Sequence, residues 1–226
     1  MLVAIDGPAG SGKSSVARTV AGRLGLANLN TGATYRAVAL VALREGVDLE
    51  DGDALSAIGS GMDLTPHGVS YDGETILEDA LRTPEVSAAA SKVSAHPQLR
   101  KVLVERQRAA ARKARASGGA VVEGRDIGTV VLPEAELKVF LSASPEERAR
   151  RRALQTGRMK ELERIREAIQ TRDKRDSERE TSPLKPASDA VVLDTTDLPF
   201  EGVVSRVVEL AHEVQNAASR GTPGGG

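Results

Sequence analysis

The 226-residue chain contains no cysteine and no tryptophan, and it has only two tyrosines and two phenylalanines. Without cysteine, neither disulfides nor thiolate-bound zinc can stabilise the fold. Cysteine usage therefore does not indicate whether the protein works in an oxidising or a reducing compartment. With so few aromatic rings the core must be aliphatic. A row of aromatic stacking platforms, which single-strand nucleic-acid binders use, is excluded.

The sequence also lacks long apolar runs and a strong charge of either sign. No run approaches the roughly 18 apolar residues of a membrane span, and no basic segment followed by an apolar one opens the chain. We therefore expect a cytoplasmic location and no membrane partner. The formal net charge of −1 argues against a bulk polyanion, so nucleic acid is not an expected partner either.

Five short aliphatic runs separated by helical periodicity predict an α/β fold. The periodicity predicts a parallel five-stranded sheet with helices on both faces. The strands are expected at 2–5, 26–30, 120–123, 137–141 and 190–193. Helices are expected after the first strand up to Gly25, at 35–44 and 97–116, from Ser144 to about 179 with a break near Gly157, and at 200–217.

Residues 47–96 differ in character from the rest. Here 62–65 and 69–71 alternate polar and apolar residues around turn signals such as Asp72-Gly73, which predicts a small β-containing insertion rather than core. The Gly-rich tail, 219–226, is expected to be flexible.

The stretch GPAGSGKS at 7–14 has the spacing Gly-x4-Gly-Lys-Ser of a phosphate-binding loop and lies between a predicted strand and a predicted helix. Glycines let consecutive amides face inward, and the helix N-terminus adds partial positive charge. Lys13 can reach the outer phosphates, and the Ser14 hydroxyl can ligate Mg²⁺. A chance glycine-rich turn would not explain this context, so we predict an ATP site formed by Gly7, Pro8, Ala9, Gly10, Ser11, Gly12, Lys13, Ser14 and Ser15.

Arginines gather behind this loop in two sets with helical spacing: Arg148, Arg151 and Arg152, then Arg172, Arg175 and Arg179. Guanidinium groups bind phosphate oxygens in pairs, which suits a site that brings two phosphorylated substrates together. A solvated helix surface with glutamate partners explains the same spacing. No Asn-Lys-x-Asp segment is present, which disfavours a GTPase.

Three further motifs follow the phosphate loop in order: NTGATYR at 30–36, EGRDIGT at 123–129 and RDKRDSER at 172–179. Together with IDGP at 5–8, this set resembles bacterial cytidylate kinases, and the similarity extends from residue 2 to the strand ending at 194. The resemblance implies transfer of the γ-phosphoryl group of ATP to CMP or dCMP, with Mg²⁺.

The resemblance also implies a division of the chain. Residues 1–46, 97–147 and 180–218 correspond to the P-loop core, 47–96 to a monophosphate-binding insertion, and 148–179 to an arginine-rich lid and substrate helix. Nothing in the sequence demands a dimer, and we expect a monomer.

Individual roles follow from the matched motifs. The resemblance places Thr31, Arg36, Arg125 and Arg179 at the acceptor phosphate, Asp176 at the ribose, and Ser91, Arg100 and Asp126 at the cytosine edge. Lys13, Arg125 and Arg172 are the expected catalytic residues, with Arg175 also near the transferring group. A carboxylate, a hydroxyl and a guanidinium can pair with the amine, ring nitrogen and carbonyl of cytosine.

The match has one departure and two open alternatives. Asn30 stands where many relatives have Asp, which puts a role in magnesium hydration in doubt. Glu123 ends a strand as a candidate acidic partner for the metal, whereas Ser14 is the only metal ligand that we name. A kinase for another small acceptor, such as UMP, dTMP or shikimate, and a nucleotide-dependent switch protein are the competing functions.

Overall fold

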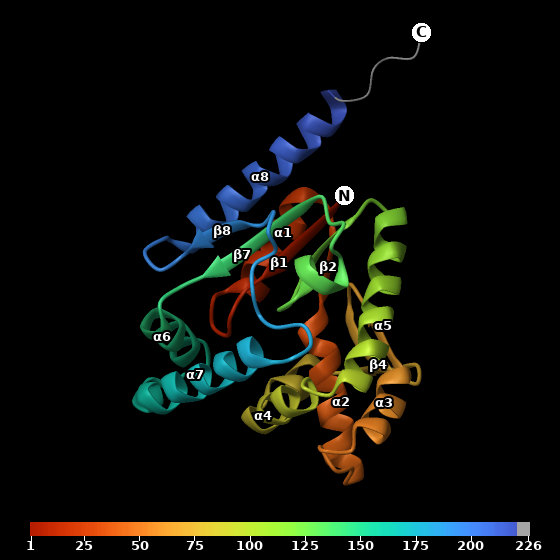
Figure 1. Cartoon of the computed structure of the whole chain (residues 1–226). Coiled ribbons are helices and arrows are strands. Elements are labelled where there is room, and N and C mark those ends of the chain that lie inside the picture. Colours follow the sequence, from red (N-terminus) through yellow and green to blue (C-terminus); the bar gives the residue numbers. More distant parts are fainter. Residues whose placement is uncertain (221–226) are drawn as a thin grey trace.

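The computed structural model describes residues 1–220, and within them five strands form one parallel sheet in the order β2-β6-β1-β7-β8. The strands are β1 (Leu2–Asp6), β2 (Ala27–Asn30), β6 (Ala120–Glu123), β7 (Leu137–Ser142) and β8 (Val191–Asp194). Figure 1 shows this sheet between helices on both sides. The predicted strands and the fold class are therefore confirmed, with ends that shift by one residue.

One face of the sheet is covered by α1 (Lys13–Leu24) and α8 (Phe200–Arg220). Val3 and Ile5 of β1 point to this face and pack with Val16 and Val20 of α1 and Val204 of α8. Gly25 ends α1 with φ 66°, a left-handed conformation that glycine adopts without strain. Helix α8 continues three residues beyond its expected end, and 221–226 of the expected tail lie outside the described residues.

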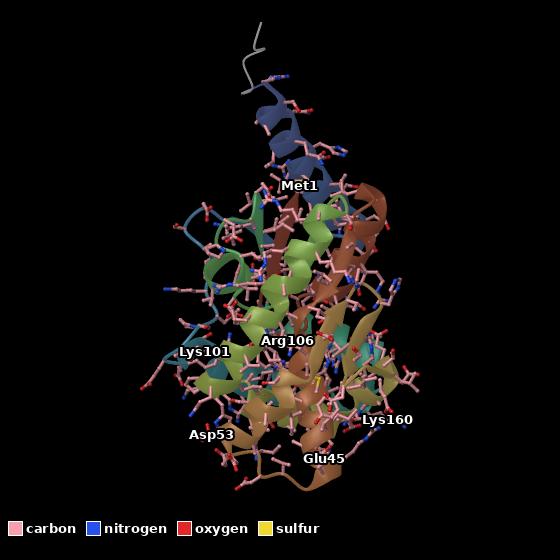
Figure 2. All side chains as sticks on the ribbon, turned by 90° about the vertical axis from the view of Figure 1, so that its right-hand side faces the viewer. Met1, Glu45, Asp53, Lys101, Arg106 and Lys160 are labelled. Carbon is pink, nitrogen blue, oxygen red and sulfur yellow. The ribbon has the colours of Figure 1, made fainter. Side chains whose placement is uncertain are left out.

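The other face is covered by α2 (Thr31–Glu45) and α5 (Pro97–Ala116); in Figure 1 α5 lies to the right of the sheet and α2 extends below it. Helix α2 begins four residues earlier than predicted, because the Asn30 side chain accepts a hydrogen bond from the Ala33 amide (3.1 Å) and caps it. In Figure 2 the outer side of α5 faces the viewer, with Lys101 and Arg106 on its exposed side.

The insertion contains α3 (Gly52–Ser60), β3 (Met62–Thr65), β4 (Gly68–Tyr71), β5 (Glu74–Ile76), the 3-10 turn η1 (Glu78–Arg82) and α4 (Pro84–Val93). Its three strands form a separate antiparallel sheet. The sequence interpretation missed both α-helices. Their start signals are present: the Asp51 side chain caps α3, and Thr83 caps α4 with Pro84 in the first turn.

The insertion also differs from the expectation that it stands apart from the core. Leu55 of α3, Met62 of β3 and Val86 of α4 belong to the same buried cluster as Leu2 of β1 and Leu99 of α5. Apolar side chains from both segments exclude water together, so the insertion and this face of the sheet share one hydrophobic core.

The arginine-rich segment folds as two packed helices, α6 (Pro145–Gln155) and α7 (Leu162–Glu178), joined by the short turn η3 (Met159–Glu161). Ser144 caps α6 by accepting from the Glu147 amide (3.2 Å), as the sequence predicts. A small apolar cluster, including Ala153 and Ile169, joins the two helices and contacts Ala9. Between β6 and β7 lies the π-helical turn η2 (Ile127–Val131).

Candidate active site

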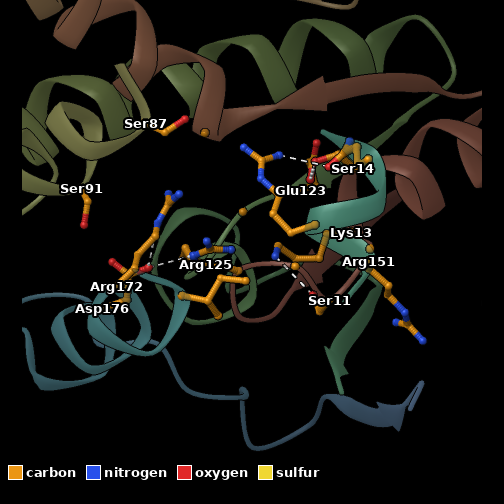
Figure 3. A pocket seen from close by; sticks show the side chains of 18 of the residues that line it. Ser11, Lys13, Ser14, Ser87, Ser91, Glu123, Arg125, Arg151, Arg172 and Asp176 are labelled. Carbon is orange, nitrogen blue, oxygen red and sulfur yellow. Dashed lines mark hydrogen bonds and ion pairs between the residues drawn. The ribbon is translucent and has the colours of Figure 1, made fainter. Parts of the chain in front are cut away.

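A cleft of about 1290 Å³ opens at the carboxyl ends of the parallel strands, where sites of open α/β sheets are expected. Its wall includes residues 9–14 of the phosphate loop (residues 7–14), the start of α2, the insertion helix α4, the loop after β6, and helices α6 and α7. Figure 3 shows its side chains converging from these segments.

The phosphate loop has the conformation that its glycines permit. Gly7, Gly10 and Gly12 have φ of 149°, 78° and 88°. At Gly7 a side chain is also excluded by space, because a Cβ would lie 2.1 Å from the Leu141 carbonyl oxygen. The Lys13 ammonium donates to the Pro8 carbonyl (2.7 Å), which places its charge against the loop.

Helices α6 and α7 hold the outer part of this loop. The Ala9 amide donates to the Asp173 carboxylate (3.0 Å), and the Ala9 carbonyl accepts from Arg148 (3.0 Å). Arg148 also pairs with Asp173, and both side chains are largely buried. This contact corrects one expectation: Arg148 turns away from the cleft, whereas Arg151 and Arg152 of the same helix line it.

Three arginines surround a carboxylate in the middle of the cleft. Asp176 accepts from Arg125 Nε (2.9 Å), and Arg172 and Arg179 approach it at 3.8 and 3.9 Å. Arg125 also donates to the Gly7 carbonyl (2.7 Å), so it connects the phosphate loop to α7. Although burial opposes it, the positive charge of Arg125 and its neighbours lowers the pKa of Asp176, which favours the carboxylate form.

A buried ion pair forms the far end of the cleft. Arg100 of α5 pairs with Asp126, and their side chains are 5% and 7% exposed. The Arg100 guanidinium lies 5.5 Å from the centre of the Tyr35 ring. Close by, Ser91 of α4 accepts a hydrogen bond from Arg175 of α7 (2.9 Å), which links the insertion to the arginine-rich helices. Arg175 therefore lies beside Ser91.

The cleft carries an excess of positive charge. Burial, with Arg125 nearby, lowers the pKa of Lys13 well below its usual range and that of Arg172 to about 10. The pKa of Arg36 also falls to about 10, mainly through burial, although Glu123 opposes the shift. Burial is the main cause of each shift, and the neighbouring arginines add to it, so several positive charges lie close together in this cleft, as a polyanion site requires.

Ser14 and Glu123 form a donor pair that suits Mg²⁺. The Ser14 hydroxyl donates to Glu123 Oε2 (2.8 Å), while Oε1 is buried with no hydrogen-bond partner among the described residues. A hydroxyl and a free carboxylate oxygen are hard ligands of the kind Mg²⁺ takes alongside phosphate oxygens and water. Within 1–220, no group of three or more histidine or acidic residues could hold a metal by itself.

The structure brings nearly all of the sequence-predicted site residues into this one cleft. Gly7 and Pro8 do not line it; their carbonyls accept from Arg125 and Lys13 instead. The others line it: Ala9, Gly10, Ser11, Gly12, Lys13, Ser14, Ser15, Thr31, Arg36, Ser91, Arg100, Arg125, Asp126, Arg172, Asp176 and Arg179.

Sequence reasoning missed several lining residues. Tyr35 and Arg82 contribute from α2 and η1, while Leu198, Pro199 and Phe200 form an apolar wall after β8. That wall has a recognisable signal, because residues that follow a parallel strand lie at the ligand-binding edge of the sheet. No comparable signal in the sequence points to Arg82, because only the folding of the insertion brings η1 to the cleft.

A phosphate loop opposite a cluster of arginines, in one cleft at the edge of a parallel sheet, defines a P-loop phosphotransferase. A family model described as "Cytidylate kinase" matches residues 3–213. The chain belongs to the cytidylate kinase family.

Individual proteins of this family are similar to the chain over most of its length. The chain is 49% identical over 217 residues to a cytidylate kinase of Exiguobacterium sibiricum, covering 92% of this chain and 96% of that protein. It is 46% identical over 225 residues to a cytidylate kinase of Streptomyces avermitilis, covering 96% and 95%. It also matches a bifunctional pantoate ligase/cytidylate kinase of a Synechococcus strain at 47% identity, where it spans 41% of that protein's length.

A solved gluconokinase from Sinorhizobium meliloti has a similar fold. Its TM-score is 0.51 at 16% identity, and the match covers 97% of each chain. At this identity the likeness concerns the fold alone. Among the described residues, no helix is long and apolar enough to cross a membrane.

Proposed function

We propose that this chain transfers the γ-phosphoryl group of ATP to CMP or dCMP, giving ADP and CDP or dCDP. The observation that carries the proposal is the arrangement of one cleft. A triphosphate-binding loop lies at one end and a buried polar pair that can read a base lies at the other, with arginines between them. Family membership supports the same reaction.

The donor lies along the phosphate loop. Backbone amides from Gly10 onward and the α1 N-terminus bind the phosphates, and Lys13 reaches the outer ones. The purine ring of ATP packs against the apolar wall at Leu198 and Phe200. Ser14, with Glu123 beside it, holds Mg²⁺, which neutralises developing charge on the phosphate oxygens when bound.

The acceptor lies between α2, α4 and α7. Asp126 accepts from the exocyclic amine of cytosine, and Ser91 and Arg100 complete recognition of the base edge. Uracil offers no amine there, so Asp126 would be left buried without a donor, which penalises UMP. The acceptor phosphate is bound by Thr31, Arg36, Arg125 and Arg179, and the ribose by Asp176.

The reaction needs no covalent enzyme intermediate, because the acceptor phosphate is itself a competent nucleophile. The protein has to align two anions and offset their repulsion. Lys13, Arg125 and Arg172 supply this positive charge, and Arg125 and Arg172 lie close enough to Lys13 to lower its pKa. Helices α6 and α7 form a lid that excludes water and so limits hydrolysis of ATP.

The proposed partners are small molecules, and nothing in the proposed reaction demands a second chain. We therefore propose a monomer that works in the cytoplasm, where its nucleotide substrates are, without nucleic acid or membrane.

The decisive experiment measures ADP production from ATP and Mg²⁺ with and without CMP. We expect ADP release to depend on CMP, with dCMP also accepted and UMP and dTMP much poorer. A low rate of ATP hydrolysis that is indifferent to all acceptors would instead indicate a nucleotide-dependent switch protein. Preference for UMP, dTMP or shikimate would indicate a different kinase.

A further inference from the structure

Asp6, the last residue of β1, is a buried carboxylate that the proposed reaction does not use. Its side chain does not line the cleft, and the residue is 5% exposed. One carboxylate oxygen accepts from the Ile127 amide and the other from the Gly128 amide, each at 2.8 Å. Both oxygens are thus engaged with the loop that follows β6.

Two further contacts join the same two segments. The carbonyl of Ile5 accepts from the Gly124 amide (3.0 Å), and the carbonyl of Gly7 accepts from the Arg125 guanidinium (2.7 Å). Three consecutive residues, 5–7, therefore hold the loop at 124–128. On their other side, the same residues lead directly into the phosphate loop.

The loop at 124–128 carries two groups of the acceptor site. Arg125 contacts Asp176, and Asp126 pairs with the buried Arg100. Immediately after Asp126, the chain turns into η2, and the two amides bound by Asp6 are the first two of that turn. The direction in which Asp126 projects therefore depends on where these amides are held.

We propose that Asp6 is a positioning residue for acceptor recognition, which holds the Arg125–Asp126 segment at a fixed distance from the phosphate loop. Only an ionised carboxylate can accept from both amides with two equivalent oxygens. An asparagine would accept one and present its own amide donor to the other. The inference concerns the acceptor that the proposed function assigns, and it rests on that assignment.

Burying Asp6 as an ionised carboxylate costs free energy. We take this cost as an argument that the charge serves the neighbouring site. Burial raises the pKa of Asp6 to about 6, and nearby Asp126 also raises it, while the two amides and Lys13 lower it. On the neighbouring strands, Glu123 of β6 and Lys138 of β7 are the closest ionisable side chains in register, and the Lys138 stem borders Gly128. A protonated Asp6 would be easier to bury but would lose one of its two acceptors.

The test is the Asp6→Asn variant, with separate KM values for CMP and ATP. We expect KM for CMP to rise at least tenfold and KM for ATP to change by less than twofold. The matched control is Asp63→Asn, which removes an exposed carboxylate that pairs with Arg106; it should leave both KM values unchanged. Equal rises in both KM values, or no change in either, would overturn the proposal.

The pH dependence separates positioning from general loss of structure. Because burial raises the pKa of Asp6 to about 6, the wild-type protein should approach the Asp6→Asn variant at low pH. The ratio of their kcat/KM values for CMP should fall from at least tenfold at pH 8 towards one at pH 5. Taking the ratio cancels titration of the CMP phosphate itself. A ratio that does not change with pH would contradict the role of the charge.

Gly128→Ala keeps the inference testable if Asp6→Asn folds poorly, and a double-mutant cycle with Asp126 tests it further if Asp6→Asn folds. Gly128→Ala places a Cβ 3.2 Å from Lys138 Cδ and 3.5 Å from Asp6 Oδ2, so it should shift the amide and raise KM for CMP selectively. In an Asp126→Asn background, Asp6→Asn should raise KM for CMP much less than it does in the wild-type protein, because Asp6 acts through Asp126. Additive effects would refute it. If wild-type protein shows no CMP-dependent ADP release, the proposed function itself fails.

Discussion

Lys13 offers the sharpest test of the phosphate site, because its replacement should separate activity from stability. We predict that Lys13→Met reduces kcat with CMP by a factor of about 10² to 10³ while leaving the fold intact. The side chain is buried at the phosphate loop, with its ammonium 2.7 Å from the Pro8 carbonyl oxygen. Methionine keeps the length of the stem and removes the charge.

The magnitudes follow from what the ammonium contacts. Removing one preorganised charged donor from a site of developing negative charge costs about 3–4 kcal/mol of transition-state stabilisation, which corresponds to the predicted rate loss. For stability, losing the charged hydrogen bonds of Lys13 to the Pro8 carbonyl and the Ser11 hydroxyl costs about 2 kcal/mol. Relief of burial and of repulsion by Arg125 and Arg172, which lower the pKa of Lys13, opposes that loss. The unfolding free energy should therefore change by no more than about 2 kcal/mol.

The assay couples ADP release to a spectroscopic readout at saturating ATP, Mg²⁺ and CMP, and denaturant unfolding gives the stability. Lys101→Met is the control, since it removes a lysine charge from the exposed side of α5 and should leave kcat within twofold. A Lys13→Met enzyme with more than a tenth of the wild-type kcat would refute the assigned role. A large loss of stability would refute the electrostatic reasoning.

Three other results are expected. Asp126→Ala should reduce the ratio of kcat/KM for CMP to kcat/KM for UMP at least tenfold, because the amine of cytosine loses its hydrogen-bond acceptor. An unchanged ratio would show that Asp126 does not contribute to recognition of the base. Ser14→Ala should raise the half-saturating Mg²⁺ concentration about tenfold with little change in KM for CMP, measured by magnesium titration, and an unaltered titration would exclude it as a ligand. Since the pKa of Asp6 is raised from 3.8 to about 6, its contribution to stability is complete below about pH 4 and is lost as pH rises through 6. The loss, about 3 kcal/mol, should be visible in unfolding free energies and absent in Asp6→Asn.

Local patterns predicted much of this fold. The runs at 120–123 and 137–141 are strands because buried parallel strands are continuously apolar. The phosphate loop and the Ser144 cap were predictable because their hydrogen bonds join residues only a few positions apart in the sequence. The helices of the insertion were missed even though their caps are present, because the alternation of the neighbouring strands dominated the interpretation of 47–96.

The candidate site was less predictable, because its contacts join distant residues. Helical spacing placed Arg148 with Arg151 and Arg152, but only the folded chain shows that Arg148 reaches back to Ala9, 139 positions earlier. The contact between Arg175 and Ser91 spans 84 positions. Such pairings depend on how α6 and α7 dock on the sheet, and the spacing of charges along one helix does not contain that information.

The hydrophobic core shared by the insertion and the sheet limits how this protein can be re-engineered. Leu55 and Met62 are buried in the same cluster as Leu99 of α5, so deleting 47–96 would uncover apolar surface on the rest of the fold as well as removing part of the proposed acceptor pocket. A graft that exchanges acceptor specificity between related enzymes would have to carry the matching faces of α2 and α5 with it. Helices α6 and α7 have a small apolar cluster of their own, but it also contacts Ala9 of the phosphate loop. Asp173 and Arg148 bind Ala9 as well, so a graft that exchanges these helices would have to keep these contacts.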